Sequence, residues 1–338
     1  MNNEKKENNW DFNYVIIKNH ANQVVAATFF TIGLFKDDMM APASISKQIE
    51  EERIKNPYYL TSNVVSMGSL VTEGEHLYLN KEAGDWKGAM KLLFHIMSEA
   101  QEKAGASMIM LRDFEDNDSE LKEFLTGQGF VKTAVPDSCV IENMNWKETD
   151  GYLNTLSYKS RRHLRTEVLK FETFYDVEIK DEVSDAELDH FMKLFNNVKS
   201  KNFDINTFDY PRSFFQSMST SKNWEFIVIR LNDSSGELNI SEPVGVVFCY
   251  KNASNHYNPV FLGINYDHQE KYNIYRQSLF QIIKRANAIG SSKVFMGLSA
   301  TIEKRKLGSR AISKVAYVQA KDNFNMEFIE TMAVKSTN

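Results

Sequence analysis

Cysteine is scarce in this sequence: only Cys139 and Cys249 occur, far apart and without a neighbouring histidine. A disulfide framework and a zinc site are therefore not supported, so we expect no metal and a reducing, cytoplasmic setting. No stretch approaches the roughly 18 apolar residues that span a bilayer, and residues 1–10 are rich in Asn, Lys and Glu. We expect no secretion signal and no membrane-spanning segment. A lipid-like substrate would then be met by peripheral contact with a membrane surface or on a carrier.

Positive charge is not in excess either. The sequence has 40 Lys and Arg residues against 45 Asp and Glu residues, which gives a formal net charge of −5. Such a chain has no general attraction to phosphate backbones, and nucleic-acid binding would need a local basic patch. We therefore expect no nucleic-acid partner.

Apolar and aromatic residues, in contrast, are abundant enough to form a hydrophobic core. Apolar residues make up 42% and aromatic residues 12% of the 338 residues. This length fits two domains of about 150 residues each. In the first half, apolar spacing predicts a helix over 86–103. The other elements expected there are strands at 14–17, 24–34, 68–71, 76–79 and 107–111, a short polar helix at 45–53, and a helix at 119–126.

The second half has the same kind of pattern. It is expected to begin with a long basic helix over 152–171, and Ser184 with Glu187 forms a capping-box signature for a further helix. The remaining expected elements are strands at 224–231, 244–250, 260–264, 293–297 and 314–319, and helices at 274–289 and 301–307.

An internal repeat links the two halves. Residues 105–110 (GASMIM) match residues 290–295 (GSSKVF) in type, and each segment follows a helix that itself follows a strand. Both copies then lead into a charged helix that ends at a glycine, Gly127 or Gly308. We interpret this as an α/β unit duplicated about 185 residues further along the chain. The expected domains are residues 10–148 and 149–335, each with a mixed central sheet flanked by helices.

This duplicated unit resembles the C-terminal half of the GNAT acyltransferase fold. Two such units in tandem resemble the Fem-type peptidoglycan aminoacyl transferases and the related GNAT-like acyl-CoA N-acyltransferases. The resemblance covers most of residues 60–330, and it is most specific in the second half. The features that carry it are the basic helix at 152–165, Phe-Leu-Gly-Ile at 261–264, Phe-Met-Gly at 295–297 and Lys-Arg-Lys-Leu-Gly at 304–308.

The resemblance implies an enzyme that uses acyl-CoA as co-substrate and acylates a small or lipid-like amine. It also implies a possible partner, because similar proteins occur beside or fused to pyridoxal-phosphate enzymes that make amino-ketones. The sequence lacks a serine or cysteine nucleophile motif, a Walker-type glycine loop and a His-Glu-x-x-His pair. Direct transfer is therefore favoured over a covalent enzyme intermediate.

A thioester donor of this kind needs backbone N–H groups at a helix start to hold its pyrophosphate. Residues 84–89 are the candidate loop, with Gly88 allowing close approach, although Asp85 departs from the family pattern and also fits an ordinary N-cap. The equivalent turn at 270–273 has no glycine, so it depends on Lys271 and on backbone amides. Two groups of basic residues, on the helices at 152–171 and 301–307, either bind an anion or form a solvated surface. They are Lys159, Arg161, Arg162, His163, Arg165, Lys304, Arg305 and Lys306, with Lys304 matching the family's lysine.

Acylation of an amine also needs a proton acceptor and a proton donor. The candidates on or beside expected strands are Glu75, His76, His256, Tyr257 and Asp267, each of which also fits an ordinary surface role. Arg112 and Asp113 follow a buried strand, where open α/β sheets place ligands or a structural ion pair. The alternatives to an acyl-CoA enzyme are a Fem-type transferase that uses aminoacyl-tRNA and a non-catalytic binding module with this fold.

Overall fold

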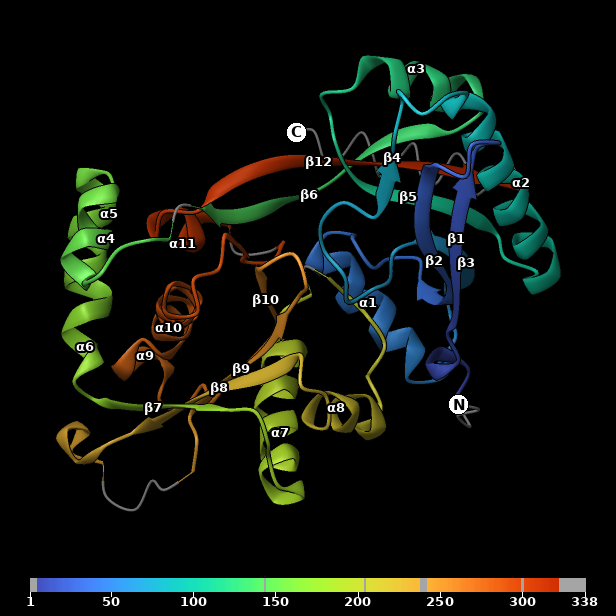
Figure 1. The fold of residues 1–338 in the computed structure, drawn as a ribbon. Coiled ribbons are helices and arrows are strands. Elements are labelled where there is room, and N and C mark those ends of the chain that lie inside the picture. The colour runs from blue at the N-terminus through green and yellow to red at the C-terminus, as the bar shows by residue number, and fades with distance from the viewer. Residues whose placement is uncertain (1–4, 143, 204, 238–241, 299–300, 322–338) are drawn as a thin grey trace. The chain divides into compact units, whose positions relative to one another are not determined.

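The structure is a computed structural model that describes residues 5–142, 144–203, 205–237, 242–298 and 301–321. The chain divides into two compact units. Unit 1 takes in the residues up to Pro136, the segment Phe203–Asp209 and the chain from Ser313 onward, and unit 2 consists of Asp137–Asn202 and Tyr210–Ile312. The α/β class with mixed strands and flanking helices is confirmed (Figure 1). The domain limits 10–148 and 149–335 stay a prediction.

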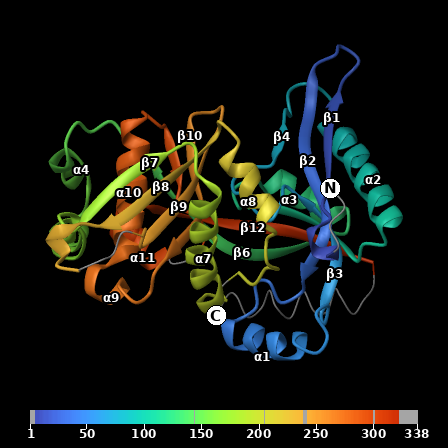
Figure 2. The same ribbon diagram turned by 90° about the horizontal axis from the view of Figure 1, so that it is seen from below.

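Unit 1 is built on a sheet with the strand order β1-β2-β3-β5-β12. Its main core lies between this sheet and α2, whose apolar face includes Met90, Leu93 and Met97. Figure 2 shows α2 alongside the β1–β2 hairpin. The elements are η1 (Lys6–Asn8), β1 (Asp11–Lys18), β2 (Val24–Lys36), α1 (Ala43–Arg53), β3 (Thr61–Met67), β4 (Leu77–Leu79), α2 (Trp86–Ala104), β5 (Met108–Glu115), α3 (Ser119–Gly127) and β12 (Arg310–Ala320).

Unit 2 has the strand order β6-β11-β10-β9-β8-β7, with α10 on one face and α7 and α8 on the other. The elements are β6 (Val131–Glu142), α4 (Thr149–Thr155), α5 (Tyr158–Leu164), the π-helical turn η2 (Arg165–Leu169), α6 (Lys170–Glu172), β7 (Tyr175–Lys180), α7 (Asp185–Lys201), α8 (Arg212–Ser219), β8 (Trp224–Leu231), η3 (Asp233–Ser235), β9 (Gly245–Lys251), β10 (His256–Ile264), α9 (Gln269–Tyr272), α10 (Ile274–Ala288), β11 (Lys293–Phe295) and α11 (Thr301–Lys306).

Both units contain the same central motif. In unit 1, β3 leads through α2 into β5, which lies parallel to β3 and pairs with it at Val64–Ser66. In unit 2, β10 leads through α10 into β11, which lies parallel to β10 and pairs with it at His256 and Tyr257. Antiparallel strands precede the motif in each case, β1-β2-β3 in one unit and β7-β8-β9-β10 in the other. The repeated strand, helix and strand expected from the sequence are therefore present.

The last strands of the two motifs are exchanged between the units. After α3 of unit 1 the chain enters β6, whose residues Val140–Glu142 belong to unit 2 and pair with β11. After α11 of unit 2 the chain enters β12, whose residues from Lys314 onward belong to unit 1 and pair with β5. Each sheet thus depends on a strand that follows the other unit's final helix.

Two of the expected elements are wrong. The basic helix is not continuous from 152 to 171, because Leu156 adopts an extended backbone and Ser157 starts a new helix by accepting a hydrogen bond from Ser160 N. Residues 68–71 are not a strand, because Gly68 has a φ of 73° and ends β3 one residue earlier, at Met67. A serine N-cap and a left-handed glycine are both local stop signals.

Segment Phe203–Asp209 is held in unit 1 by a buried polar cluster. Asn206 donates to Asp38 Oδ2 at 2.9 Å and accepts from Lys36 Nζ at 3.1 Å, while Arg53 bonds Asp38 Oδ1 at 2.5 Å. Burial alone would raise the pKa of Glu50, but hydrogen bonds from Lys36, Asn206 and Arg53 hold that pKa at about 2. The Glu50 carboxylate is therefore ionised and closely paired at neutral pH.

Replacing Asn206 by Ala is expected to lower the free energy of unfolding by about 1–3 kcal/mol, because buried Asp38 and Lys36 each lose a partner. Urea unfolding followed by circular dichroism measures the change. The matched control is Asn117→Ala, at an exposed position, with an expected change within about 0.5 kcal/mol. Equal stabilities of the two variants would contradict a role for the cluster in holding the segment.

Candidate functional site

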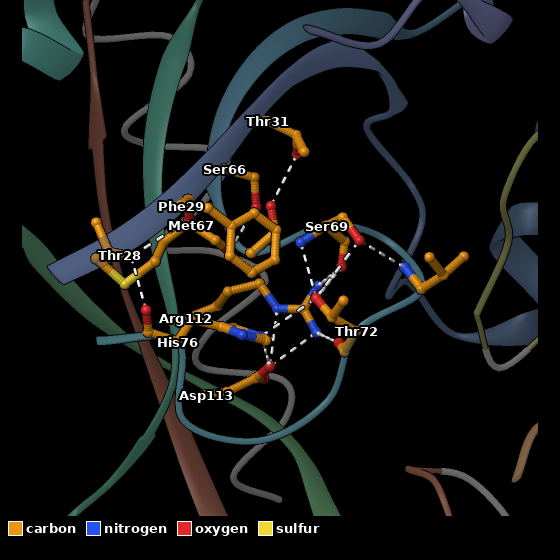
Figure 3. A network of polar contacts seen from close by, with 12 residues as sticks. Thr28, Phe29, Thr31, Ser66, Met67, Ser69, Thr72, His76, Arg112 and Asp113 are labelled. Atoms are coloured by element: carbon orange, nitrogen blue, oxygen red, sulfur yellow. Dashed lines mark hydrogen bonds and ion pairs between the residues drawn. The ribbon is translucent and has the colours of Figure 1, made fainter. Parts of the chain in front are cut away.

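In unit 1 a network of polar side chains binds the loop after β3 to β5 (Figure 3). Arg112, on β5, donates from Nη1 to the carbonyl of Ser69 and from Nη2 to the carbonyl of Thr72, each at 2.8 Å. Arg112 also bonds Asp113 Oδ2 through Nε and Nη2, and His76 Nε2 lies 3.0 Å from the same oxygen. The side chains of Arg112, Asp113 and His76 are 5–8% exposed. The loop after β3 is therefore fastened to β5.

Two backbone positions of unit 1, Asp113 and Gly68, are also constrained by this network. Asp113 has a φ of 69°, which is costly for a residue other than glycine and needs strong surrounding contacts. A Cβ atom on Gly68 would lie 2.5 Å from the His76 ring, so only glycine fits there. Burial alone would raise the pKa of Asp113, but the His76 hydrogen bond and the Arg112 charge bring that pKa below its usual range. The Asp113 carboxylate is thus ionised within a buried structural network.

The helix start in unit 1 is also occupied. Asp85 is the N-cap of α2, and its carboxylate accepts a hydrogen bond from Gly88 N at 2.8 Å. A Cβ atom on Gly88 would lie 2.3 Å from Asp85 Oδ2. The glycine is therefore needed for close approach of this carboxylate, and an anionic donor at the same place would meet a negative charge.

Unit 2 differs at the equivalent helix start. The first turn of α10 carries no acidic side chain, and its Tyr275 N–H donates at 2.8 Å to the uncharged Gln269 side chain and not to the N-cap residue Asn273. Arg276 lies in that turn and bonds Glu303 on α11 and Glu167 on η2. Gln277 also donates to the carbonyl of Val168 on η2. The helices η2, α10 and α11 therefore meet where α10 begins.

Unpaired arginines gather on the helices around this point. Among the described residues, the side chains of Arg161, Arg162, Arg165 and Arg305 form no ion pair, and we call these four the arginine cluster. They lie on α5, η2 and α11, and α5 packs against α11 (Figure 1). Every other arginine of the chain is paired with Asp or Glu, namely Arg53, Arg112, Arg212, Arg230, Arg276, Arg285 and Arg310. The acidic side chains of the same helices, Glu167 and Glu303, bond Arg276 and leave these four guanidinium groups without an ion pair.

A histidine lies beside the arginine cluster. His163 Nε2 is buried without a hydrogen-bond partner among the described residues and is 3.7 Å from Glu303 Oε2. Burial lowers the pKa of His163, an effect that the Glu303 charge only partly offsets. The imidazole is therefore neutral at pH 7, next to a carboxylate that would stabilise its protonated form.

Lys304 lies on the same helix as Glu303 and is 5% exposed. Its Nζ atom would be 3.3 Å from a Cβ atom placed on Gly297, just after β11. Two of the segments on which the family resemblance rests, 295–297 and 304–308, therefore come together in unit 2.

The expected catalytic residues on β10 lie at the far end of that strand. His256 and Tyr257 are where β10 pairs with β11, whereas the strand's other end leads toward α10. Tyr257 is fully buried and donates its hydroxyl proton to Glu225 at 2.6 Å. Burial, together with neighbouring Cys249 and Glu225, raises the pKa of Tyr257 well above its usual range. Burial and then the Lys293 charge lower the pKa of His256.

The remaining predicted residues lie elsewhere. Asp267 is exposed and follows β10 on the side that leads to α10, and Lys271 in α9 bonds Glu237 at 2.7 Å. Glu75 and Gly88 belong to unit 1. Of the predicted residues, Arg161, Arg162, Arg165 and Lys304 lie on helices that contact one another, namely α5, η2 and α11. Sequence reasoning missed Arg276 and Glu303 because only the fold places them beside the basic helix, although the Glu303 position next to the family's lysine was a usable signal.

No helix among the described residues is long and apolar enough to span a bilayer. Within the same residues, no group of three or more His, Cys, Asp or Glu side chains is arranged to hold a metal ion.

Comparison with known proteins bears on the family and on the fold. Residues 158–305 match the family model described as an acetyltransferase (GNAT) domain, a range that contains the whole arginine cluster and Lys304. A tandem GNAT protein from the clavulanic acid biosynthesis pathway superposes with a TM-score of 0.55 at 10% identity, covering 92% of this chain and 83% of that one. The structure of L-PGS from Bacillus licheniformis gives a TM-score of 0.53 at 10% identity, covering 80% and 84%. These likenesses show the fold.

A curated relative is 23% identical over 275 residues, which is 78% of this chain. It is a protein of Mycobacterium tuberculosis whose name is 8-amino-7-oxononanoate synthase 2, and the chain spans only 34% of its length. The expectation of an acyltransferase with the GNAT fold is confirmed. Residues 158–305, which carry the family match, form a GNAT acetyltransferase domain.

Proposed function

We propose that unit 2 transfers an acyl group from acyl-CoA, or from a thioester on an acyl carrier, directly to a small or lipid-like amine. The observation that carries this proposal is the arginine cluster beside the start of α10, inside the GNAT match. Guanidinium groups bind phosphate through paired, charge-assisted hydrogen bonds, and a helix start favours anions. The cluster, with Lys304, would hold the phosphates of the donor.

The transfer step needs no enzyme nucleophile. The amine nitrogen attacks the thioester carbonyl carbon, a C–N bond forms, and the C–S bond breaks to release the thiolate. The proton lost by the amine ends on the thiolate, directly or through a base. We propose His163 as this base, with Glu303 stabilising the imidazolium, because it is neutral at pH 7 and lies beside the arginine cluster. His256, Tyr257, Asp267 and Glu75 remain predictions for such roles.

We further propose one donor site per chain. In unit 1 the Arg112 network binds the loop after β3 to β5, and Asp85 occupies the start of α2. At the start of α10 in unit 2, by contrast, the Tyr275 N–H is bonded by the uncharged Gln269 side chain, and Arg276 lies in the first turn. The first unit would then support the fold and leave transfer to the second.

The acceptor is proposed to be an amino-ketone or a related lipid-like amine. The name of the Mycobacterium tuberculosis relative describes the synthesis of a compound with an amino and a keto group. A pyridoxal-phosphate synthase of that kind would supply such an amine and is the proposed partner. A cytoplasmic location is part of the proposal, since both cysteines are free and buried.

The purified chain is expected to release thiol from acyl-CoA when an amino-ketone is added, because direct transfer frees one thiol per amide formed. Isothermal titration with CoA is expected to give one site per chain. Absence of both thiol release and CoA binding would favour a non-catalytic module. Activity that needs aminoacyl-tRNA and is lost on ribonuclease treatment would favour the Fem-type alternative.

Arg162→Glu is expected to raise the KM for acyl-CoA about tenfold with little change in kcat, because a charge-assisted hydrogen bond to the donor is lost. Lys47→Glu makes the same change of charge at an exposed position of α1 and is the control. Equal KM values for the two variants would contradict donor binding at the arginine cluster.

The pH profile identifies the base. Since burial lowers the pKa of His163 from 6.5, kcat/KM should stay high down to below pH 6.5 and then fall as the imidazole is protonated. His163→Gln is expected to lower kcat about 100-fold or more and to remove this acid limb. His256→Gln is the matched comparison, and loss of the acid limb in that variant alone would assign the base to His256 instead.

A further inference from the structure

An exposed apolar surface lies on the outer face of β1 in unit 1. Along this strand Val15 and Ile17 point into the core beneath α2, so the alternate residues point outward. The outward side chains are Phe12, Tyr14 and Ile16, which are 52%, 78% and 65% exposed. The surface continues onto β2, where Phe29 stacks on Tyr14 at 5.8 Å, and onto β4, where Tyr78 is 54% exposed. We call these five residues the apolar strip.

The apolar strip borders a free sheet edge. β1 is the outermost strand of the unit 1 sheet and, among the described residues, pairs only with β2. Edge strands are normally protected by charged residues, proline or a bulge. Between Asp11 and Lys18 the sequence is FNYVII, without charge or proline, and the irregularity of pairing lies at the end, between Ile17 and Lys18. The edge is therefore open to a further strand.

We propose that a second copy of this chain docks here, with the two β1 strands pairing antiparallel across a two-fold axis. The two-fold axis must keep both apolar strips on one face of the joined sheet. Residues that face each other must therefore both have even numbers or both have odd numbers. Centring it on Tyr14 meets this condition. Tyr14 then faces the same residue of the second copy, and Phe12 faces Ile16 in both directions.

Charge supports this direction of pairing. Asp11 and Lys18 are the charged residues of β1, one at each end. Antiparallel pairing brings the Asp11 end of one strand to the Lys18 end of the other, whereas parallel pairing would put like charges together. Because side chains alternate along the strand, Asp11 and Lys18 lie on opposite faces, so this attraction acts between strand ends and is not an ion pair. The strip is also rich in aromatic residues and poor in charge, as protein interfaces are at their centre, whereas membrane-surface sites carry Lys or Arg around the apolar face.

The test is the mass of the chain in solution. Sedimentation equilibrium from about 1 to about 200 µM is expected to show a mass that rises toward twice that of one chain. Tyr14→Lys places two like charges face to face on the axis and is expected to abolish the rise. Ile54→Lys changes a residue that is 83% exposed outside the strip and should leave the rise intact. Circular dichroism establishes that both variants are folded.

A cross-link tests the register independently. Facing residues of an antiparallel pair have Cα atoms roughly 4.5–5.5 Å apart, which a disulfide can bridge. Tyr14→Cys is therefore expected to form a covalent dimer under mild oxidation, while Ile54→Cys is not, and the buried Cys139 and Cys249 do not compete. A wild-type chain that stays monomeric throughout, or a dimer that survives Tyr14→Lys, would overturn the proposal. So would binding of this face to anionic vesicles by a monomer.

Discussion

Each unit depends on two neighbouring parallel strands that are hydrogen-bonded along only part of their length. β3 and β5 pair at Val64–Ser66, and β10 and β11 pair only at His256 and Tyr257. Where such strands separate, backbone groups and space are left that must be filled by side chains, water or a ligand. The two units meet this requirement differently, and that difference is what gives one of them a candidate site.

The two units differ in the charge of a few side chains at the start of the helix between their parallel strands. In unit 1, Arg112 supplies the missing donors to the loop carbonyls, and Asp85 caps the helix that follows β3. In unit 2, the corresponding helix starts beside Arg276 and the arginine cluster. A carboxylate at a helix start excludes a second anion, and cations without protein partners favour one. Two units with the same backbone motif can therefore differ in whether they carry a candidate anion site.

The sequence predicted those features that local residues determine. Ser184 and Glu187 form the capping box with both hydrogen bonds present, and the apolar spacing of α2 and α10 was sufficient to locate them. The strand expected after the helix at 119–126 could not be given bounds, because β6 contains Pro136 and pairs with β11, more than 150 residues away in the chain. The arginines of α5 and η2 could be found because they are adjacent in sequence. Their position beside Arg276 and Glu303 could not, because it follows from how α10 and α11 pack.

The exchange of β6 and β12 constrains how the two units can diverge. Because β12 follows α11 of unit 2 yet completes the unit 1 sheet at β5, unit 1 cannot close its sheet without the chain that follows unit 2. The reverse holds for β6 and β11. A unit that lost its donor site could therefore not be lost from the protein, since its partner's sheet would lack a strand and expose an unpaired edge. If unit 2 alone carries the donor site, as proposed above, the retention of unit 1 follows from this topology and requires no second activity.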